Sequence, residues 1–269
     1  MPAEEPVSGS GVILKARDEA PSPWQDREWA VPAATPDTPL RDAEYCAFDL
    51  ETNGSTPFWV IEIGAERFSL ARPLAFFDTL CDTSAPINVY ARRRHGISPA
   101  MLRGAPSFEE ARAAFLGFAR GTALVEHSHD AFDSYLMGRG LAQPLAHPVF
   151  DTSSLARLVL DLPAGQTPGL ARVVEELGLQ VNPAHAALGD AQATAAVFRE
   201  LIRRGMEQFG WQTLGDVLAV QQRPEVDRSA IALDAPNRGT AGARGANTGG
   251  GGRPRRRRRR PAPRRSERE

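Results

Sequence analysis

The stretch Tyr45-Cys-Ala-Phe-Asp-Leu-Glu-Thr52 decides the fold of this chain. Its strand-forming residues predict a β-strand, in which side chains two positions apart point to the same face. Asp49 and Glu51 therefore share one face, whereas Phe48 and Leu50 pack on the other. Two carboxylates placed side by side repel each other unless a cation lies between them. Oxygen ligands of this kind suit Mg²⁺ or Mn²⁺.

Three further stretches carry polar residues that would complete this pair. Asp133 follows the apolar run Thr122–Glu126, which predicts a second buried strand. Asp190 opens a periodic stretch that predicts a long helix, and His185 precedes it by five residues on a loop that contains proline and glycine. Each signal alone is weak, because Asp-x-Glu strands and histidines near helix starts are common at protein surfaces. Their order and context together favour a metal-dependent site.

These residues resemble the motifs of the DEDDh group of 3′–5′ exonucleases, which includes the epsilon proofreading subunit of bacterial DNA polymerase III. The resemblance runs from about Ala43 to Arg204. Residues 48–54 match the first motif, and residues 60–64 match the strand that follows it. His95-Gly96-Ile97 and residues 124–133 match the second region. Residues 185–194 match the third and keep the family's His-x4-Asp spacing.

The resemblance implies a ribonuclease-H-like fold, with a five-stranded mixed sheet flanked by helices. The order of elements in the sequence agrees with this fold class. Three successive strands with short polar breaks come first, and helices then alternate with strands. Such an order is typical of an α/β domain with a mixed sheet.

The resemblance also implies catalytic roles for five residues. Asp49, Glu51, Asp133 and Asp190 correspond to the ligands of two Mg²⁺ or Mn²⁺ ions, and His185 corresponds to the general base. Two such ions can clamp the attacking and leaving oxygens of an in-line phosphoryl displacement. An imidazole suits removal of a proton from water near neutral pH.

Six further residues are predicted to contact the substrate: Thr52, Asn53, Gly54, Phe58, Arg94 and His95. The first three would present backbone groups to the terminal nucleotide. Phe58 would stack on a base, although a core position is the other interpretation of this aromatic residue. The arginine run that ends at Arg94 would grip phosphates beside the scissile one, or form a solvated loop.

The segment before Asp133 departs from the family pattern, which has His-Asn three residues ahead of Phe-Asp. An ungapped alignment puts Ser128 and His129 in those two places. A one-residue insertion instead puts His127 and Ser128 there. Asp133 keeps its place in both alignments, so the departure concerns contacts of this turn to substrate and not the metal ligands.

Several functions are compatible with this set of residues. The favoured one is a metal-dependent 3′–5′ exonuclease that releases nucleoside 5′-monophosphates from single-stranded nucleic acid, with DNA in proofreading or repair as the expected substrate. An exoribonuclease that trims RNA 3′ ends is the alternative, because both share the catalytic groups and differ in contacts to the 2′-hydroxyl. A noncatalytic nucleic-acid-binding scaffold would not need the intact five-residue set. The expected partners are DNA or RNA 3′ ends, with a DNA polymerase subunit or a sliding clamp as further candidates.

Composition divides the chain into four segments. Residues 1–40 and 223–269 are rich in Pro, Gly, Ala or Arg and are predicted to be disordered extensions. The exonuclease domain is predicted at residues 43–205, followed by a short helical appendage at 206–222. Residues 253–269 hold ten Arg and two Glu, a charge of +8, so residues 1–252 carry −9 of the total of −1. The basic segment is either a nucleic-acid-binding arm or an unspecialised solvated tail.

The sequence indicates a cytoplasmic protein without a membrane segment. Met1–Ala20 lacks the apolar core of a signal peptide, and no apolar run approaches the length of a membrane span. Cys46 and Cys81 are predicted to be buried free thiols, as expected in a reducing compartment.

Overall fold

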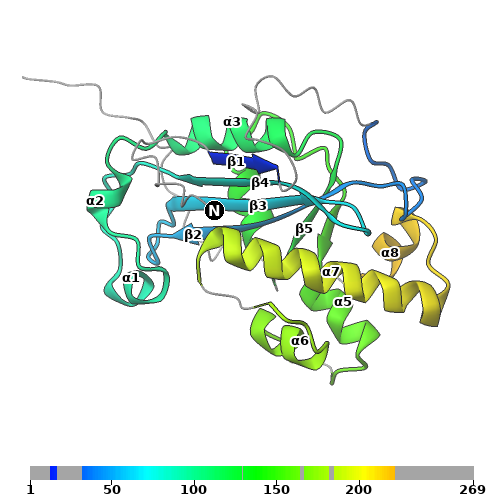
Figure 1. The fold of residues 1–269 in the computed structure, drawn as a ribbon. Helices are drawn as coiled ribbons and strands as arrows, with labels where there is room; N and C mark the ends of the chain where they lie inside the picture. Colours follow the sequence, from blue (N-terminus) through cyan, green and yellow to red (C-terminus); the bar gives the residue numbers. More distant parts are fainter. Residues whose placement is uncertain (1–12, 17–31, 129, 164–166, 182–184, 222–269) are drawn as a thin grey trace, which may run out of the picture. The chain divides into compact units, whose positions relative to one another are not determined.

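A mixed β-sheet forms the centre of the computed structural model, which describes residues 13–16, 32–128, 130–163, 167–181 and 185–221 (Figure 1). Its strands are β1 (Ile13–Ala16), β2 (Tyr45–Thr52), β3 (Val60–Phe68), β4 (Pro73–Leu80), β5 (Ala123–Glu126) and β6 (Val149–Asp151). They are arranged in the order β1-β4-β3-β2-β5-β6. The pairs β1–β4, β4–β3 and β3–β2 are antiparallel. Strand β5 is parallel to both of its neighbours, β2 and β6. Strands β2 to β6 confirm the predicted five-stranded mixed sheet, and β1 adds a sixth strand at its edge.

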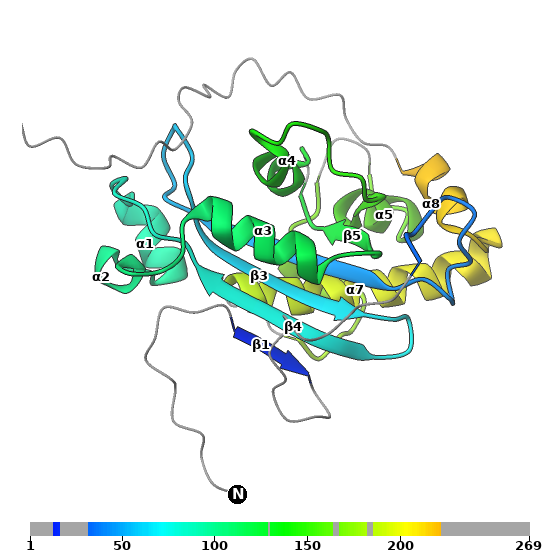
Figure 2. The same cartoon turned by 90° about the horizontal axis from the view of Figure 1, so that it is seen from above.

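Eight helices flank the sheet in the described part of the chain. They are α1 (Val89–His95), α2 (Pro99–Leu102), α3 (Phe108–Phe118), α4 (Phe132–Gly138), α5 (Thr152–Val159), α6 (Leu170–Glu176), α7 (Ala187–Phe209) and α8 (Leu214–Val220). Helices α3 and α7 lie on opposite faces of the sheet, as Figures 1 and 2 show, and α5 and α6 pack beside α7. The described residues belong to one compact unit, Met1–Asp234. The predicted disordered extension at residues 223–269, which includes the basic tail, is not among the described residues.

Strand β2 separates two hydrophobic cores because its side chains alternate between the faces of the sheet. Tyr45 and Ala47 pack in the core beneath α7, α5 and α6. Phe48 and Leu50 pack in the core beneath α3, where the Phe48 and Phe115 ring centroids are 5.3 Å apart. The alternation predicted for this strand is confirmed, and it places Asp49 and Glu51 on the face that α7 covers.

Part of the predicted N-terminal extension has a defined structure. Ile13–Ala16 pairs antiparallel with β4. Leu40 is fully buried, and its carbonyl accepts a hydrogen bond of 2.8 Å from the Tyr45 hydroxyl. The prediction that residues 1–40 are disordered is therefore wrong for these residues. Four residues are too few to show a recognisable strand pattern in the sequence. This strand is stabilised by its pairing with β4, which the local sequence does not reveal.

The predicted appendage at residues 206–222 belongs to the core of the domain. Helix α7 continues to Phe209, and Trp211 folds back onto Gly205, where any side chain would collide with the indole ring. Leu214 and Val217 of α8 are fully buried. The boundary predicted at residue 205 is therefore wrong, since the chain after it completes the core that α7 begins.

Helices α1 and α2 were not expected from the sequence. The Asn88 side chain caps α1 by accepting a hydrogen bond of 2.8 Å from the Tyr90 N–H. The run Arg92–Arg94 therefore lies in a helix, and the interpretation as a solvated loop is wrong. Because α1 has no buried residues, its sequence lacks the apolar periodicity by which helices are recognised.

The expectation for the two cysteines is confirmed. Cys46 and Cys81 are both free and buried. Among the described residues, no helix combines the length and the apolar character needed to cross a membrane.

Candidate functional site

Three carboxylates meet beneath the first turn of α7. Asp49 and Glu51 reach there from β2, and Asp190 reaches there from the helix. Their ligand oxygens all lie within 4.8 Å of one another. The strand alternation places the first two on one face, and docking of α7 on that face brings the third. The residues predicted as metal ligands on β2 and α7 thus lie close together, although almost the whole sequence of the domain separates them.

The three carboxylates line a hollow of about 380 Å³. The other lining residues are Leu50, Thr52, Tyr90, Ala91, Arg94, His95 and His185. The hollow therefore holds Thr52, Arg94 and His95 from the predicted substrate-contacting set, with the predicted general base. Tyr90 is an addition that the sequence did not suggest, and its side chain is 74% exposed on α1.

Asp133 lies in the first turn of α4 and is buried, but it is not a member of the group of three. The start of α4 is held by two side chains of the preceding segment. The Ser128 hydroxyl accepts a hydrogen bond of 2.9 Å from the Phe132 N–H, and Glu126 accepts one of 2.8 Å from the Ser134 N–H. Burial and the nearby Glu126 raise the pKa of Asp133 well above its usual range.

The segment that departs from the family pattern uses its residues for structure. Ser128 caps α4, as described above. The ring of His127 points to other elements, with Nδ1 2.7 Å from the Thr152 hydroxyl and Nε2 2.9 Å from the Pro168 carbonyl. Both ring nitrogens of His127 are thus occupied away from the hollow. His129 lies outside the described residues.

The electrostatics of the hollow favour a bound cation. Burial and the charges of Asp133 and Asp190 raise the pKa of Asp49 well above its usual range. Burial, followed by the charge of Glu62, raises the pKa of Glu51 to about 7. Ionising all of these groups without a counter-charge is costly. Carboxylate oxygens at this spacing are the donor set that Mg²⁺ and Mn²⁺ prefer, so the residues fit such an ion.

Strand β3 contributes two residues that the sequence did not identify as part of the site. Glu62 lies opposite Glu51 in the antiparallel register, and Gly64 lies opposite Asp49. The Glu62 carboxylate accepts a hydrogen bond of 3.0 Å from the Ala187 N–H at the start of α7. A signal was available, because strand alternation puts both residues on the face that carries Asp49 and Glu51.

His185 lies just before α7 with its side chain 46% exposed. Its backbone is in the left-handed region, with φ of 52°. Its Nδ1 is 3.9 Å from Asp190 Oδ2 and accepts a hydrogen bond of 3.2 Å from Arg94 Nε. The imidazole thus borders the carboxylates, and its role as a base stays a prediction.

Three residues of the predicted substrate-contacting set lie outside the hollow. The Asn53 N–H donates a hydrogen bond to the Trp59 carbonyl (2.9 Å), and the Asn53 carbonyl accepts one from the Asn88 N–H (2.8 Å). The Gly54 N–H donates to the Thr52 hydroxyl at 3.3 Å. The predicted contact of the Asn53 and Gly54 backbone with the terminal nucleotide stays a prediction. These bonds fix the turn between β2 and β3 and tie it to the residue that caps α1.

Phe58 occupies a core position. Its ring packs edge-on against Phe132, with 5.1 Å between the centroids, and it adjoins the core beneath α3. Arg139 donates a hydrogen bond of 3.1 Å to the Phe58 carbonyl. Phe58 thus supports α4, which carries Asp133, and the interpretation as a core residue is the one that the structure supports.

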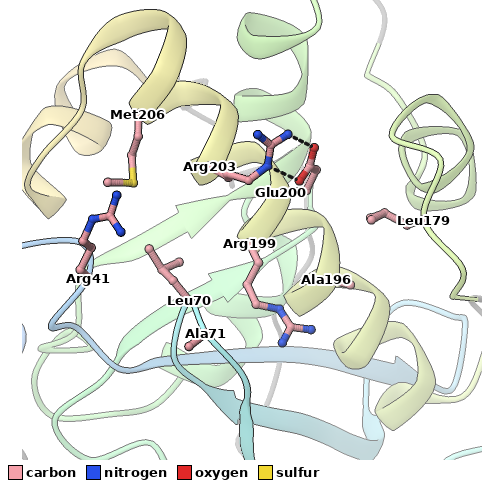
Figure 3. A pocket seen from close by; sticks show the side chains of 9 residues that line it. All are labelled: Arg41, Leu70, Ala71, Leu179, Ala196, Arg199, Glu200, Arg203 and Met206. Atoms are coloured by element: carbon pink, nitrogen blue, oxygen red, sulfur yellow. Dashed lines mark hydrogen bonds and ion pairs between the residues drawn. The ribbon is translucent and has the colours of Figure 1, made fainter.

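A second and larger hollow, of about 660 Å³, lies between α7 and the β3–β4 turn (Figure 3). Its carboxylate, Glu200, accepts hydrogen bonds of 2.7 and 2.8 Å from Arg203 and one of 2.8 Å from Arg204. These bonds hold the pKa of Glu200 low, at about 2. The single carboxylate of this hollow is therefore already paired with arginines, whereas the carboxylates of the smaller hollow lie beside one another and need a cation. The smaller hollow is the better candidate for chemistry.

The raised pKa of Glu51 predicts a pH-dependent stability in the absence of metal. Between its ordinary value of 4.5 and about 7, the folded protein binds more protons than the unfolded chain, so the free energy of unfolding falls as pH rises. Glu51→Gln removes this loss. In EDTA, the Tm of Glu51→Gln minus that of the wild type should be larger at pH 8 than at pH 5.

The matched control for this measurement is Glu110→Gln, at a carboxylate that lies at the start of α3 away from the hollow. Its Tm difference from the wild type should not grow with pH. A Glu51→Gln difference that is equal at pH 5 and pH 8 would contradict the raised pKa.

Comparison with known proteins gives a family match over most of the described domain. A model of the RNase T exonuclease family matches residues 46–198. The "DNA polymerase III subunit epsilon" of Treponema pallidum is 32% identical over 179 residues, which cover 62% of this chain and 80% of that protein. A "DNA polymerase III subunit epsilon-like protein" of Rhodobacter capsulatus is 33% identical over 192 residues, which cover 66% of this chain. The match spans only 27% of that second relative.

A "DNA polymerase III PolC-type" protein of Caldanaerobacter subterraneus is 29% identical over 191 residues, which are 69% of this chain and 13% of that protein. Among solved structures, the nuclease domain of 3′hExo, described as a DEDDh family member bound to rAMP, aligns with a TM-score of 0.53 at 16% identity. This alignment covers 61% of this chain and 94% of that one. Exonuclease I aligns with a TM-score of 0.54 at 18% identity, and the alignment covers 62% of this chain and 42% of that one. These likenesses show a shared fold.

Proposed function

Because the chain belongs to the RNase T exonuclease family, we propose that it is a 3′–5′ exonuclease that hydrolyses the terminal phosphodiester bond of single-stranded DNA and releases nucleoside 5′-monophosphates. The observation that carries this proposal is the convergence of Asp49, Glu51 and Asp190, with His185 at their border. The same arrangement supports a site for two Mg²⁺ or Mn²⁺ ions, with Asp133 as the fourth carboxylate.

The proposed reaction is an in-line displacement by water. Water attacks the terminal phosphorus, the bond to the 3′ oxygen breaks, and the phosphate leaves on the released nucleotide. When bound, the cations would make the attacking water more acidic and neutralise the charge that develops on the departing oxygen. His185 would take the proton of that water, and its exposed imidazole beside Asp190 supports this role. Arg94 would then bind phosphate in place of its present contact with His185.

Two residues of the hollow would hold the terminal nucleotide in this proposal. Tyr90 is exposed on α1 and lines the hollow, so its ring is available to stack on a base. His95 is fixed in orientation, because its Nδ1 accepts a hydrogen bond of 3.0 Å from the Ile97 N–H. Both belong to α1, so this helix would contribute the contacts to the terminal nucleotide.

DNA is the proposed substrate because two relatives above 30% identity bear names of DNA polymerase III epsilon or epsilon-like subunits. The same names support a DNA polymerase subunit as a partner, and a role in proofreading or repair. The match spans only 13% of the PolC-type relative and 27% of the epsilon-like relative. The proposed contact with a polymerase subunit therefore concerns the exonuclease domain that the relatives share with this chain.

The proposal is tested with single-stranded DNA and RNA oligonucleotides of one sequence, labelled at the 5′ end. With Mg²⁺ or Mn²⁺, the purified protein should shorten the DNA stepwise from the 3′ end, and chromatography should identify nucleoside 5′-monophosphates. EDTA should stop the reaction. Undiminished cleavage in EDTA, or release of 3′-monophosphates, would contradict the proposal. Faster cleavage of RNA than of DNA would transfer it to RNA 3′-end trimming.

A further inference from the structure

Helix α7, which carries Asp190, begins without a capping side chain of its own. The first N–H groups of a helix have no partner within the helix, and a Ser, Thr, Asn or Asp at the N-cap commonly accepts one of them. The N-cap residue of α7 is Ala186, whose methyl group has no acceptor. The turn that positions Asp190 is therefore not held by its local sequence.

Glu62 of β3 supplies the missing acceptor from a distant part of the chain. Its Oε2 accepts a hydrogen bond of 3.0 Å from the N–H of Ala187, the first residue of α7. A carboxylate at this position also interacts favourably with the partial positive charge at the start of a helix. Glu62 is thus a cap contributed by the sheet to the helix that lies on it.

Gly64, two residues after Glu62 on β3, leaves the space that the start of α7 needs to reach the strand. A Cβ at this position would collide with the backbone of Ala187 and Leu188. The missing side chain lets the first turn of α7 lie directly on the strand. Because residues two apart share a face of the sheet, Glu62 and Gly64 together form the seat of this turn.

We propose that Glu62 is a positioning residue, which caps α7 from β3 and thereby holds Asp190 and His185 against the two carboxylates of β2. His185 precedes the capped residue Ala187 by two positions, and Asp190 follows it by three. Releasing Ala187 would free both residues at once. The inference rests on the proposed function, in which these carboxylates bind the metal ions. It assigns Glu62 no contact with substrate.

The test compares Glu62→Ala with Glu62→Gln in the full chain. The dissociation constant of Mn²⁺ is measured by electron paramagnetic resonance, and kcat and KM are measured on a single-stranded oligonucleotide. Glu62→Ala should weaken Mn²⁺ binding and lower kcat by about 10- to 100-fold, the usual effect of losing a residue that orients a ligand. KM should change little. Glu62→Gln should restore most of both values, because its amide oxygen reaches Ala187 equally well.

The matched control is Glu110→Ala, which removes a carboxylate cap from α3, where Glu110 Oε2 accepts a hydrogen bond of 2.8 Å from the Ser107 N–H. This change should lower thermal stability and leave Mn²⁺ affinity and kcat unchanged. Three results would overturn the proposal. They are wild-type Mn²⁺ affinity in Glu62→Ala, an equal loss of affinity in Glu110→Ala, and no recovery in Glu62→Gln.

A further variant keeps the test decisive if Glu62→Ala does not fold. Glu62→Asp retains the charge but shortens the side chain, so it should lose the bond to Ala187 and bind Mn²⁺ more weakly than Glu62→Gln. Wild-type affinity in Glu62→Asp would overturn the proposal. A wild-type protein that binds Mn²⁺ but cleaves neither DNA nor RNA would contradict the proposed function instead, and the Mn²⁺ measurements would still decide the role of Glu62.

Discussion

Replacing Asp49 by alanine is expected to abolish hydrolysis of nucleic acid without lowering the thermal stability of the metal-free protein. Asp49 is one of the three groups whose oxygens lie within 4.8 Å, so its loss removes a ligand from the centre of the site. Burial and four neighbouring carboxylates raise the pKa of Asp49, which means that its charge is unfavourable in the metal-free fold. The Tm of the variant in EDTA should therefore equal or exceed that of the wild type.

Two variants control this experiment. Asp49→Asn keeps the shape of the side chain and should be as inactive as Asp49→Ala, which separates the effect of charge from that of packing. Asp42→Ala, at an exposed carboxylate shortly before β2, should leave both activity and Tm in place. Full activity of Asp49→Ala with Mg²⁺ would refute the assignment of this hollow as the active site.

Replacing His185 by alanine is expected to lower kcat on the order of 10²- to 10⁴-fold, the usual cost of losing a general base. Mn²⁺ affinity should change little, because His185 borders the carboxylates without belonging to the group of three. Steady-state kinetics at saturating Mg²⁺ and Mn²⁺ titration of the same preparation measure the two effects.

Asp190→Ala provides the contrast to His185→Ala. Asp190 is a member of the group of three, so this variant should lose Mn²⁺ affinity together with activity. If both variants lose metal affinity equally, His185 is a ligand or a structural residue, and its role as base is wrong.

The part of the site that lies on β2 and at the start of α7 could be predicted from the sequence. A strand has a period of two, so the spacing of Asp49 and Glu51 places them on one face before anything else is known. Asp190 stands at the start of a stretch with clear helical periodicity, and that helix is present. In both cases the local pattern determines the direction of the side chain.

The contacts that depend on other parts of the chain could not be predicted in this way. The backbone of Asn53 is occupied by Trp59 and Asn88, which its local sequence does not reveal. Helix α1 has no buried face, so no periodicity announces it, although it contributes Tyr90 and Arg94 to the hollow. The role of Glu62 depends on a residue 125 positions away. Such contacts follow from the assembled fold and not from local propensity.

The capping of α7 by β3 also bears on when the protein becomes active during its synthesis. Roughly 140 residues separate Glu51 from Asp190, and ribosomes add about 5 to 20 residues per second. The first two carboxylates therefore leave the ribosome roughly 7 to 28 seconds before the third. Until α7 reaches its seat on β3, a nascent chain lacks one wall of the hollow and the neighbouring histidine. On the proposed function, cleavage of nucleic acid thus has to wait until almost the whole domain has emerged.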